Sequence, residues 1–357
     1  MTNPTNKLQT PQTRSVPTGF IMPGEWHPHE ATWLSWPNNV DTWTEQMDVV
    51  ENAYVQFIQS LTPGEKVKLL VDSPTEKKRV EFILSKHNAL NPNVILLEVP
   101  TVDVWIRDYG PNFVLKGKEV GWNRWHFNAW GNKYADLAKD DIVPDLLDKK
   151  KLLPAQRFET GLVMEGGSID VNGAGVCLTT EQCLLAPTRN PSLNKAQIEN
   201  ELKKRLGVSK VIWLGEGIEG DDTDGHVDDI SRFVAPDTIV TAYEDDPKDF
   251  NHEPLHHNYE KLCRETDANG KPFKILKLPM PGRVDYEGRR LPASYANFYI
   301  GNASVVVPIF GHKNDQKALT ILDSVFPDRK VVGIDCRIFV RGLGTLHCAS
   351  QQEPKGA

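Results

Sequence analysis

The sequence predicts a mixed α/β protein built from repeated units that form a closed array. Three observations support this prediction. Amphipathic or capped stretches typical of helices are each followed by a short apolar run typical of a strand. Two strand-like segments stand ahead of each of the later helices. The order strand, strand, helix, strand therefore recurs at roughly sixty residues, a period typical of supersecondary units that stack or close on themselves.

The expected elements follow this order along the chain. Helical periodicity is clearest in residues 47–61, where six apolar or aromatic side chains share one face. Further helices are expected at about 134–149, 192–206, 253–265 and 313–326. The strand after each helix is expected at 66–71, 157–163, 210–214, 273–278 and 330–334, and strand pairs at 230–234 with 238–243 and at 298–300 with 304–307. A doubly wound sheet is the alternative, but it alternates single strands with helices.

The composition is that of a soluble globular protein. The 357-residue chain is 39% hydrophobic and 25% charged, and no apolar run approaches the ~20 residues that a membrane span requires. We therefore expect no membrane contact. Residues 1–17 are rich in Thr, Asn, Gln and Pro and lack the hydrophobic segment of a secretory signal. They are expected to form a flexible tail ahead of a single domain at 18–357.

The cysteine count indicates the cellular location of the protein, and the net charge indicates which classes of ligand it binds. Five cysteines without a Cys-x-x-Cys motif favour neither a disulfide framework nor a zinc cluster, and they indicate a reducing, cytoplasmic location. The net charge of −7 disfavours nucleic acid, whose binding depends on clustered Lys and Arg. It mildly favours a small cationic ligand.

Unusual polar segments stand where one unit joins the next. Each follows a strand-like run, and the four are TVDVWIRDYGP at 101–111, MEGGSIDV at 164–171, GEGIEGDDTDGHVDDISRF at 215–233 and GLGTLHCASQQEP at 342–354. In a closed array, equivalent joints converge on one axis. We therefore expect one side chain from each segment to reach a common site. These side chains are Asp108, Glu165, His226 and Cys348.

Cys348 is the candidate nucleophile, with a buried structural thiol as the alternative. A cysteine attacks as the thiolate, which needs a nearby base or cation. Adjacent residues of an extended segment point to opposite faces, so His347 is not expected to be that base. His226, which lies in an acidic loop, is expected to take the role.

The acidic neighbours of this pair predict a cationic substrate. Carboxylates raise the pKa of a thiol unless a cation lies among them. A guanidinium is planar, permanently charged and paired bidentately by carboxylates. Bound between two acids, it presents its central carbon to the sulfur while its charge favours the thiolate.

Two patterns resemble metal sites. DGHVD at 224–228 resembles the metal-binding stretch of binuclear-manganese ureohydrolases, but no second dense Asp cluster accompanies it. HEPLH at 252–256 satisfies the letters of the zincin motif. Pro254 is tolerated only in a first helical turn and puts His252 at or before the helix start, so the two histidines share no established helical face. We expect neither a metal nor another cofactor.

Five ordered motifs together resemble the agmatine deiminase family, which also holds the bacterial peptidyl-arginine deiminases. The motifs are GFIMPGEWHPHEATWLSWP, DVWIRDYGP, MEGGSIDVNG, DTDGHVDD and GLGTLHCASQQEP. The likeness runs from about Gly19 to Pro354. It implies one catalytic domain of the pentein fold, a five-bladed α/β propeller of ββαβ units around a pseudo-fivefold axis. That fold agrees with the repeat in the sequence.

The resemblance also implies the catalytic roles. Cys348 is similar to the family nucleophile, and His226 is similar to its general acid and base. Glu165 is similar to the carboxylate that positions the guanidinium and the histidine. The glycine run before the nucleophile is sparser in GLGTLHC than the family pattern leads us to expect, which makes backbone contacts there less certain.

Four residues are expected to bind substrate. Asp108 and Asp228 are similar to the two guanidinium-binding acids of the family, and Trp105 is similar to a tryptophan that lines its pocket. A core tryptophan is an equally good account of Trp105. Asn297, in SYANFYIGN at the fourth joint, is expected to face the site.

The implied reaction is deimination of agmatine to N-carbamoylputrescine and ammonia through a covalent amidino-thioether, a step toward putrescine and the polyamines. Free arginine or peptidyl-arginine, a metal-dependent ureohydrolase reaction and a guanidinium-binding module without catalysis are the alternatives. Free arginine requires a cation for its α-carboxylate, and the candidates are Arg124, Arg189, Arg232, Arg283 and Arg341. A secreted enzyme for peptidyl-arginine is expected to have a signal peptide. A homo-oligomer is left open.

Overall fold

The computed structural model describes residues 16–356. Most of the tail predicted at 1–17 therefore lies outside the described residues, and the single domain at 18–357 stays a prediction. No helix in the described part of the chain is both long and apolar enough to cross a bilayer.

Five sheets repeat one strand order, as the sequence predicts. In each sheet the first two strands are antiparallel and the next is parallel to the second. The sheets are β18 (Ser350–Pro354) with β1 (His29–Ser35), β2 (Lys66–Val71) and β3 (Val94–Glu98); β4 (Asn112–Lys116) with β5 (Glu119–His126) and β6 (Gln156–Val163); β7 (Asp170–Val171) with β8 (Val176–Thr180) and β9 (Lys210–Leu214); β10 (Ser231–Ala235) with β11 (Thr238–Tyr243) and β12 (Lys274–Pro279); and β15 (Tyr299–Ile300) with β16 (Ser304–Ile309) and β17 (Lys330–Asp335). A small hairpin joins β13 (Asp285–Tyr286) to β14 (Arg289–Arg290). The mixed α/β class is confirmed, whereas the pseudo-fivefold axis stays a prediction.

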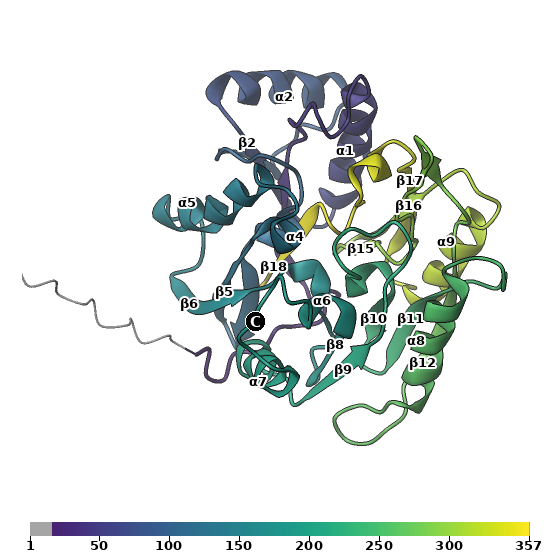
Figure 1. Ribbon diagram of the computed structural model, residues 1–357. Helices are drawn as coiled ribbons and strands as arrows, with labels where there is room; N and C mark the ends of the chain where they lie inside the picture. Colours follow the sequence, from purple (N-terminus) through teal and green to yellow (C-terminus); the bar gives the residue numbers. More distant parts are fainter. Residues whose placement is uncertain (1–15, 357) are drawn as a thin grey trace, which may run out of the picture.

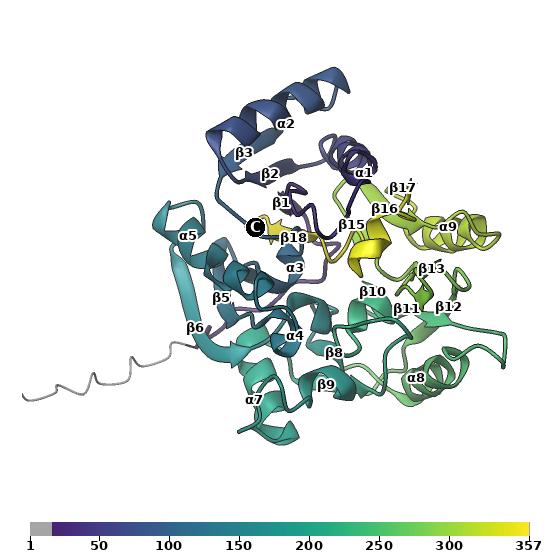
Figure 2. The same cartoon turned by 45° about the horizontal axis from the view of Figure 1, so that its top comes forward.

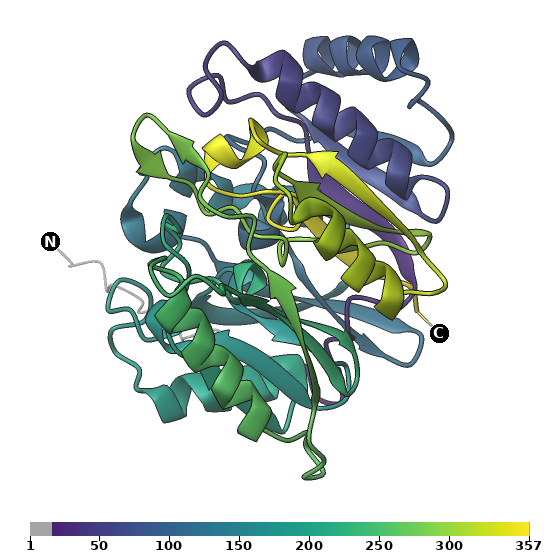
Figure 3. The same cartoon turned by 90° about the vertical axis from the view of Figure 1, so that its right-hand side faces the viewer.

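Helical segments make the crossover that each parallel strand pair requires. The crossovers contain α1 (Met47–Leu61), α5 (Val143–Lys149), α7 (Lys195–Leu206), α8 (His252–Arg264) and α9 (Asp315–Val325). The remaining helical segments in residues 16–356 are α2 (Pro74–Lys86), α3 (Ile106–Tyr109), α4 (Ala129–Asn132), α6 (Glu181–Leu184), η1 (Leu137–Ile142), η2 (Gly166–Ser168), η3 (Val227–Asp229) and η4 (Phe339–Gly342). The units follow one another around the molecule with the crossover helices outside (Figures 1 and 2), and α1, α8 and α9 cover one side (Figure 3).

Two local predictions need correction. The helix expected at 134–149 is the turn η1 followed by α5, which restarts with Pro144 in its first turn because proline is tolerated there but not in a helix interior. The sequence prediction also omitted α2, although its signal was present. Ser73 caps α2 by accepting a hydrogen bond from the backbone N–H of Glu76, and Pro74 begins the helix.

The zincin-like histidines begin a helix, as Pro254 predicts. His252 is the first residue of α8, and Pro254 lies in its first turn. His252 Nδ1 and His256 Nε2 lie 2.8 and 3.0 Å from the same acceptor, the carbonyl oxygen of Glu244. The expectation that the two histidines share no helical face was wrong, since their ring centroids are 3.8 Å apart, but these ring nitrogens contact a backbone carbonyl.

The last strand of the chain completes the first sheet. β18 pairs antiparallel with β1, and β1 pairs parallel with β2, so Trp33 lies opposite both Gln351 and Lys68. Because Cys348 lies two residues before β18, this pairing fixes the residue against elements from the start of the described chain.

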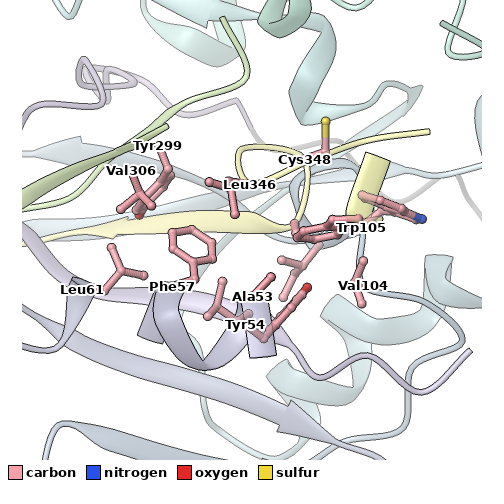
Figure 4. Close-up of a cluster of buried hydrophobic side chains, with 14 of the residues drawn as sticks. Ala53, Tyr54, Phe57, Leu61, Val104, Trp105, Tyr299, Val306, Leu346 and Cys348 are labelled. Atoms are coloured by element: carbon pink, nitrogen blue, oxygen red, sulfur yellow. The ribbon is translucent and has the colours of Figure 1, made fainter. Parts of the chain in front are cut away.

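The largest hydrophobic cluster lies directly under this joint. Phe57 of α1 packs against Tyr299, with ring centroids 5.8 Å apart, whereas the ring of Tyr54 lies on the side of Trp105 (Figure 4) and its centroid is 5.5 Å from that of Phe339. The sulfur of Cys348 points away from the apolar side chains of this cluster (Figure 4). The core therefore supports the backbone at Cys348 and leaves its sulfur on the opposite side.

Candidate active site

The predicted site residues lie at joints that follow the last strand of each unit. Asp108 lies in α3 after β3, Glu165 precedes η2 after β6, and His226 precedes η3 after β9. Asn297 lies between β12 and β15, and Cys348 lies between β17 and β18. Each of these five residues is at most 6% exposed. All five units therefore contribute a buried polar or thiol side chain.

Asn297 holds the loop that carries Cys348. Its Nδ2 donates to the sulfur of Cys348 at 2.9 Å, and its Oδ1 accepts from the Oγ1 of Thr345 at 2.7 Å. The same Oδ1 accepts from the backbone N–H groups of His347 and Cys348 at 3.1 and 3.3 Å. Nδ2 also donates to Asp229 Oδ1 at 3.0 Å, so Asn297 links the thiol loop to the acidic loop, and its predicted role in substrate binding stays a prediction.

Asp108, His226 and Asp228 surround Gly167. The backbone N–H of Gly167 donates to Asp108 Oδ1 at 2.9 Å, and His226 Nδ1 lies 3.8 Å from the same oxygen. A Cβ on residue 167 would lie 2.6 Å from His226 Nδ1, 2.9 Å from Asp108 Oδ1 and 3.0 Å from Asp228 Oδ2. Only a glycine lets these three side chains approach one another here. Asp228 continues the contact to Cys348, whose sulfur lies 3.7 Å from Asp228 Oδ2.

Glu165 is held by an ion pair with Arg189. The sequence did not reveal that these two residues are partners. Arg189 donates through Nε to Glu165 Oε1 at 2.8 Å and through a terminal nitrogen to Asp224 Oδ2 at 2.7 Å. Both Arg189 and Glu165 have fully buried side chains. Arg189 was a candidate for binding an α-carboxylate, but its place is beside Glu165.

Four buried polar atoms of the predicted residues lack a hydrogen-bond partner among residues 16–356. They are Glu165 Oε2, Asp228 Oδ1 and both ring nitrogens of His226. Buried polar atoms are normally paired, so their free state at one place indicates a position for a ligand. The other oxygen of each carboxylate has a hydrogen-bond partner. Arg189 is the partner of Glu165, and His347 is the partner of Asp228.

Burial and charge set the resting protonation of the thiol and the imidazole. Burial, with the carboxylates of Asp228, Asp229 and Asp108, raises the pKa of Cys348 well above its usual range. Burial lowers the pKa of His226 to about 4. Both the thiol of Cys348 and the imidazole of His226 are therefore neutral before a cation binds.

Trp130 is a site residue that the sequence analysis missed. Its indole Nε1 donates to Asp108 Oδ2 at 2.9 Å, which leaves both oxygens of that carboxylate bonded. Trp130 and Ala129 have φ values of 53° and 52°, a left-handed conformation that costs free energy for these residue types. The glycine and asparagines of NAWGN signal a turn, but residue type alone does not indicate where this indole points.

A cavity of about 530 Å³ leads to Cys348 and Asp108. Aromatic side chains form much of its wall, namely Trp105, Trp130 and Tyr134. Trp105 stacks on Phe339 with centroids 6.0 Å apart and is 4% exposed, so it is both a core and a wall residue. The other predicted residues, His226, Glu165, Asp228 and Asn297, do not line this cavity and are buried behind it.

The buried thiol, imidazole and carboxylates, placed at the joints of repeated α/β units, define the class of cysteine enzymes that act on guanidino groups. Comparison with known proteins gives the family. The profile of the Porphyromonas-type peptidyl-arginine deiminases matches residues 21–354. An agmatine deiminase of Medicago truncatula is 37% identical over 373 residues, which cover 94% of this chain and 96% of that protein. The chain belongs to the Porphyromonas-type peptidyl-arginine deiminase family and is an enzyme of the deiminase type.

Solved structures of agmatine deiminases are similar to this chain over nearly its whole length. The agmatine deiminase of Enterococcus faecalis is 34% identical, with a TM-score of 0.88 over 97% of this chain and 99% of that one. A C. jejuni agmatine deiminase with a cysteine-to-serine substitution and bound substrate is 35% identical, with a TM-score of 0.85 over 94% and 97% of the two chains. An amidinotransferase from Microseira wollei, 13% identical with a TM-score of 0.53 over 96% and 97%, is similar in fold alone.

Gly167→Ala is expected to abolish binding of the guanidinium ion, measured by isothermal titration calorimetry, because the added Cβ displaces His226 and Asp108. The matched control is Gly215→Ala, where the nearest neighbours of a Cβ lie at an ordinary 3.5 Å. Both variants are expected to keep the native circular dichroism spectrum. Unchanged guanidinium affinity in Gly167→Ala would contradict this placement of the site.

The raised pKa of Cys348 predicts a thiol that stays protonated at about pH 7 until a cation binds. The ultraviolet absorbance of the thiolate, taken as wild type minus Cys348→Ala, is expected to be absent from the free enzyme. It is expected to appear when guanidinium is added below denaturing concentrations. A full thiolate signal without any ligand would show that the thiolate is preformed.

Proposed function

We propose that this chain deiminates agmatine, giving N-carbamoylputrescine and ammonia in the route to putrescine and the polyamines. The distribution of charge along the cavity carries this proposal. Asp108 lies at its inner end, and Asp222 with the exposed Asp41 and Asp136 lies farther out. Agmatine carries a guanidinium at one end and an ammonium at the other, so carboxylates along the cavity match both ends.

Free arginine matches this cavity less well. Among the described residues that line it, Arg341 is the one Lys or Arg, and its guanidinium lies 4.1 Å from the ring centroid of Tyr286. The other arginines that the sequence offered are in ion pairs elsewhere: Arg124 with Asp141 and Asp145, Arg189 with Glu165 and Asp224, Arg232 with Glu25 and Asp170, and Arg283 with Asp285. The α-carboxylate of arginine would therefore lie among acids.

The donor atoms also disfavour the ureohydrolase alternative. Two groups of His, Cys, Asp and Glu side chains in the described chain are close enough to share an ion, namely Glu165 with Cys183 and His226, and Asp228 with Asp229 and Cys348. Each group includes a thiol, a soft ligand, whereas manganese prefers carboxylate, carbonyl and water oxygens. The residues present do not fit a binuclear manganese centre, so we assign no step to a metal.

In the first half-reaction the guanidinium lies between Asp108 and Asp228. The thiol proton of Cys348 passes to the neutral His226, and the thiolate adds to the central carbon of the guanidinium. His226 then gives that proton to one amino group of the tetrahedral adduct. Ammonia leaves, and a cationic amidino-thioether remains on Cys348.

In the second half-reaction His226 acts as a base. It takes a proton from water, and the hydroxide adds to the amidino carbon. The carbon–sulfur bond then breaks, Cys348 recovers its proton from His226, and the protonated urea loses a proton to ammonia. Agmatine and water thus give N-carbamoylputrescine and ammonium.

All five cysteines are free in the structure, which supports the cytoplasmic setting expected from the sequence.

Ammonia release from agmatine, free arginine and an arginyl peptide, measured side by side, tests the substrate. We expect kcat/KM for agmatine to exceed both others by about a hundred-fold or more, since an unpaired carboxylate among acids costs several kcal/mol. Arg341→Gln is expected to lower KM for agmatine by about two- to five-fold, because it removes a repulsive charge at an exposed site. A preference for arginine that Arg341→Gln abolishes would overturn the substrate assignment and leave the chemistry of Cys348 in place.

A further inference from the structure

His347 lies buried between two carboxylates. Its Nδ1 is 2.7 Å from Asp228 Oδ2, and its Nε2 is 2.8 Å from Glu25 Oε2. The side chain is 2% exposed. Both ring nitrogens therefore have hydrogen-bond contacts with acidic side chains. The expectation that His347 does not serve Cys348 as a base agrees with this geometry, but the expectation left the residue without a role.

Hydrogen-bond valence limits the protonation of this group. A neutral imidazole carries one N–H and one lone pair, and an ionised carboxylate only accepts. If both carboxylates are ionised, a neutral His347 would direct a lone pair at a carboxylate oxygen at hydrogen-bond distance. Both short contacts are satisfied only when both ring nitrogens carry a proton.

The surroundings keep both carboxylates ionised. Glu25 Oε1 accepts from the backbone N–H of Ile300 at 2.8 Å, and Oε2 lies 3.0 and 3.5 Å from terminal nitrogens of Arg232 and Arg107. Burial opposes ionisation of Glu25, whereas the charges of Arg232 and Arg107 lower its carboxyl pKa. Burial also opposes ionisation of Asp228, and the charge of Arg232 again acts in the opposite direction on its pKa.

A charged His347 adds a third cation to the buried ionic groups that contact one another behind the site. Arg232 Nε pairs with Asp170 Oδ2 at 2.5 Å, and Arg107 Nε donates to the carbonyl oxygen of His347 at 3.3 Å. The cations are then Arg107, Arg232 and His347, and the anions are Glu25, Asp170 and Asp228. Buried ions require such pairing because their desolvation is costly. Two further groups lie near His347. Cys348 is the next residue in the chain, and the backbone N–H of His347 donates to Asn297 Oδ1.

We propose that Glu25 and Asp228 hold His347 as an imidazolium, and that the pair Glu25 and His347 are positioning residues for Asp228. The imidazolium binds Oδ2 of Asp228, so the free Oδ1 is the oxygen left for the guanidinium. Glu25 acts through His347 and touches neither the thiol nor the substrate position. The charge state of His347 stands on this geometry alone, whereas its effect on turnover rests on the proposed function.

The charge state is tested on the ligand-free wild-type protein labelled with ¹⁵N-histidine. Both ring nitrogens of His347 are expected to carry a proton at neutral pH, because each contacts a carboxylate oxygen at hydrogen-bond distance. His347→Gln assigns the signals. One unprotonated ring nitrogen on His347 at neutral pH would overturn the proposal, whatever the substrate of the enzyme.

The positioning role is tested with the isosteric variant Glu25→Gln. This variant removes one of the two carboxylates that hold the imidazolium, so the positive charge of His347 is kept at low pH and lost more readily as pH rises. We expect KM for agmatine to rise by about ten- to hundred-fold on the alkaline side, because Asp228 loses a charged hydrogen bond, and to recover toward wild type at lower pH. Wild type is expected to lack this ionisation.

The matched control is Glu353→Gln, five residues beyond Cys348. Glu353 is also buried and accepts from Trp33 Nε1 at 2.8 Å and from Lys68 Nζ at 2.5 Å, but it does not contact His347. This variant is expected to lower the melting temperature and leave the pH profile of KM unchanged. If Glu25→Gln also keeps the wild-type profile, Glu25 is merely structural and the positioning role is refuted. If agmatine is not turned over at all, the proposed function fails while the spectroscopic result still decides the charge of His347.

Discussion

The cost of burying several carboxylates around one thiol governs the design of this site. Burial, together with the charges of Asp228, Asp229 and Asp108, raises the pKa of Cys348 and suppresses its thiolate until a cation binds. Such a cluster is tolerated only if cations lie within reach. Arg189 supplies one beside Glu165, and Arg107, Arg232 and His347 supply others behind Asp228. No such cation lies at the thiol itself among the described residues. A guanidinium substrate would supply that positive charge.

This arrangement couples nucleophile activation to substrate binding. A resting enzyme with a neutral thiol and a neutral His226 is a weak nucleophile. Entry of a cation favours transfer of the thiol proton to the imidazole, which then holds the proton that ammonia needs to leave. The pairing of β18 with β1 holds Cys348 in reach of acids from earlier units. Reactivity therefore depends on a sheet that joins the two ends of the described chain.

The repeat was predictable from the sequence because each unit has its own local hydrophobic pattern, which indicates one helix and the strands around it. The joints were predictable for the same reason, since polar segments follow buried strands, and the structure brings Asp108, Glu165, His226 and Cys348 to one region. What the sequence concealed are partnerships between distant positions. His347 and Glu25 are 322 residues apart, Arg189 and Glu165 lie on separate segments, and Trp130 reaches Asp108 from a strained turn. Residue type and spacing do not reveal which charge a buried side chain meets.

The central claim is that Cys348 carries the amidino group during turnover. Mass spectrometry of enzyme quenched with acid during agmatine turnover tests it most directly, with peptide mapping to locate the adduct. The account predicts an adduct of agmatine less ammonia on the peptide that contains Cys348, lost when turnover is complete and never formed in Cys348→Ala. Product that accumulates while Cys348 stays unmodified under every quench condition, or an adduct on another residue, would contradict the account.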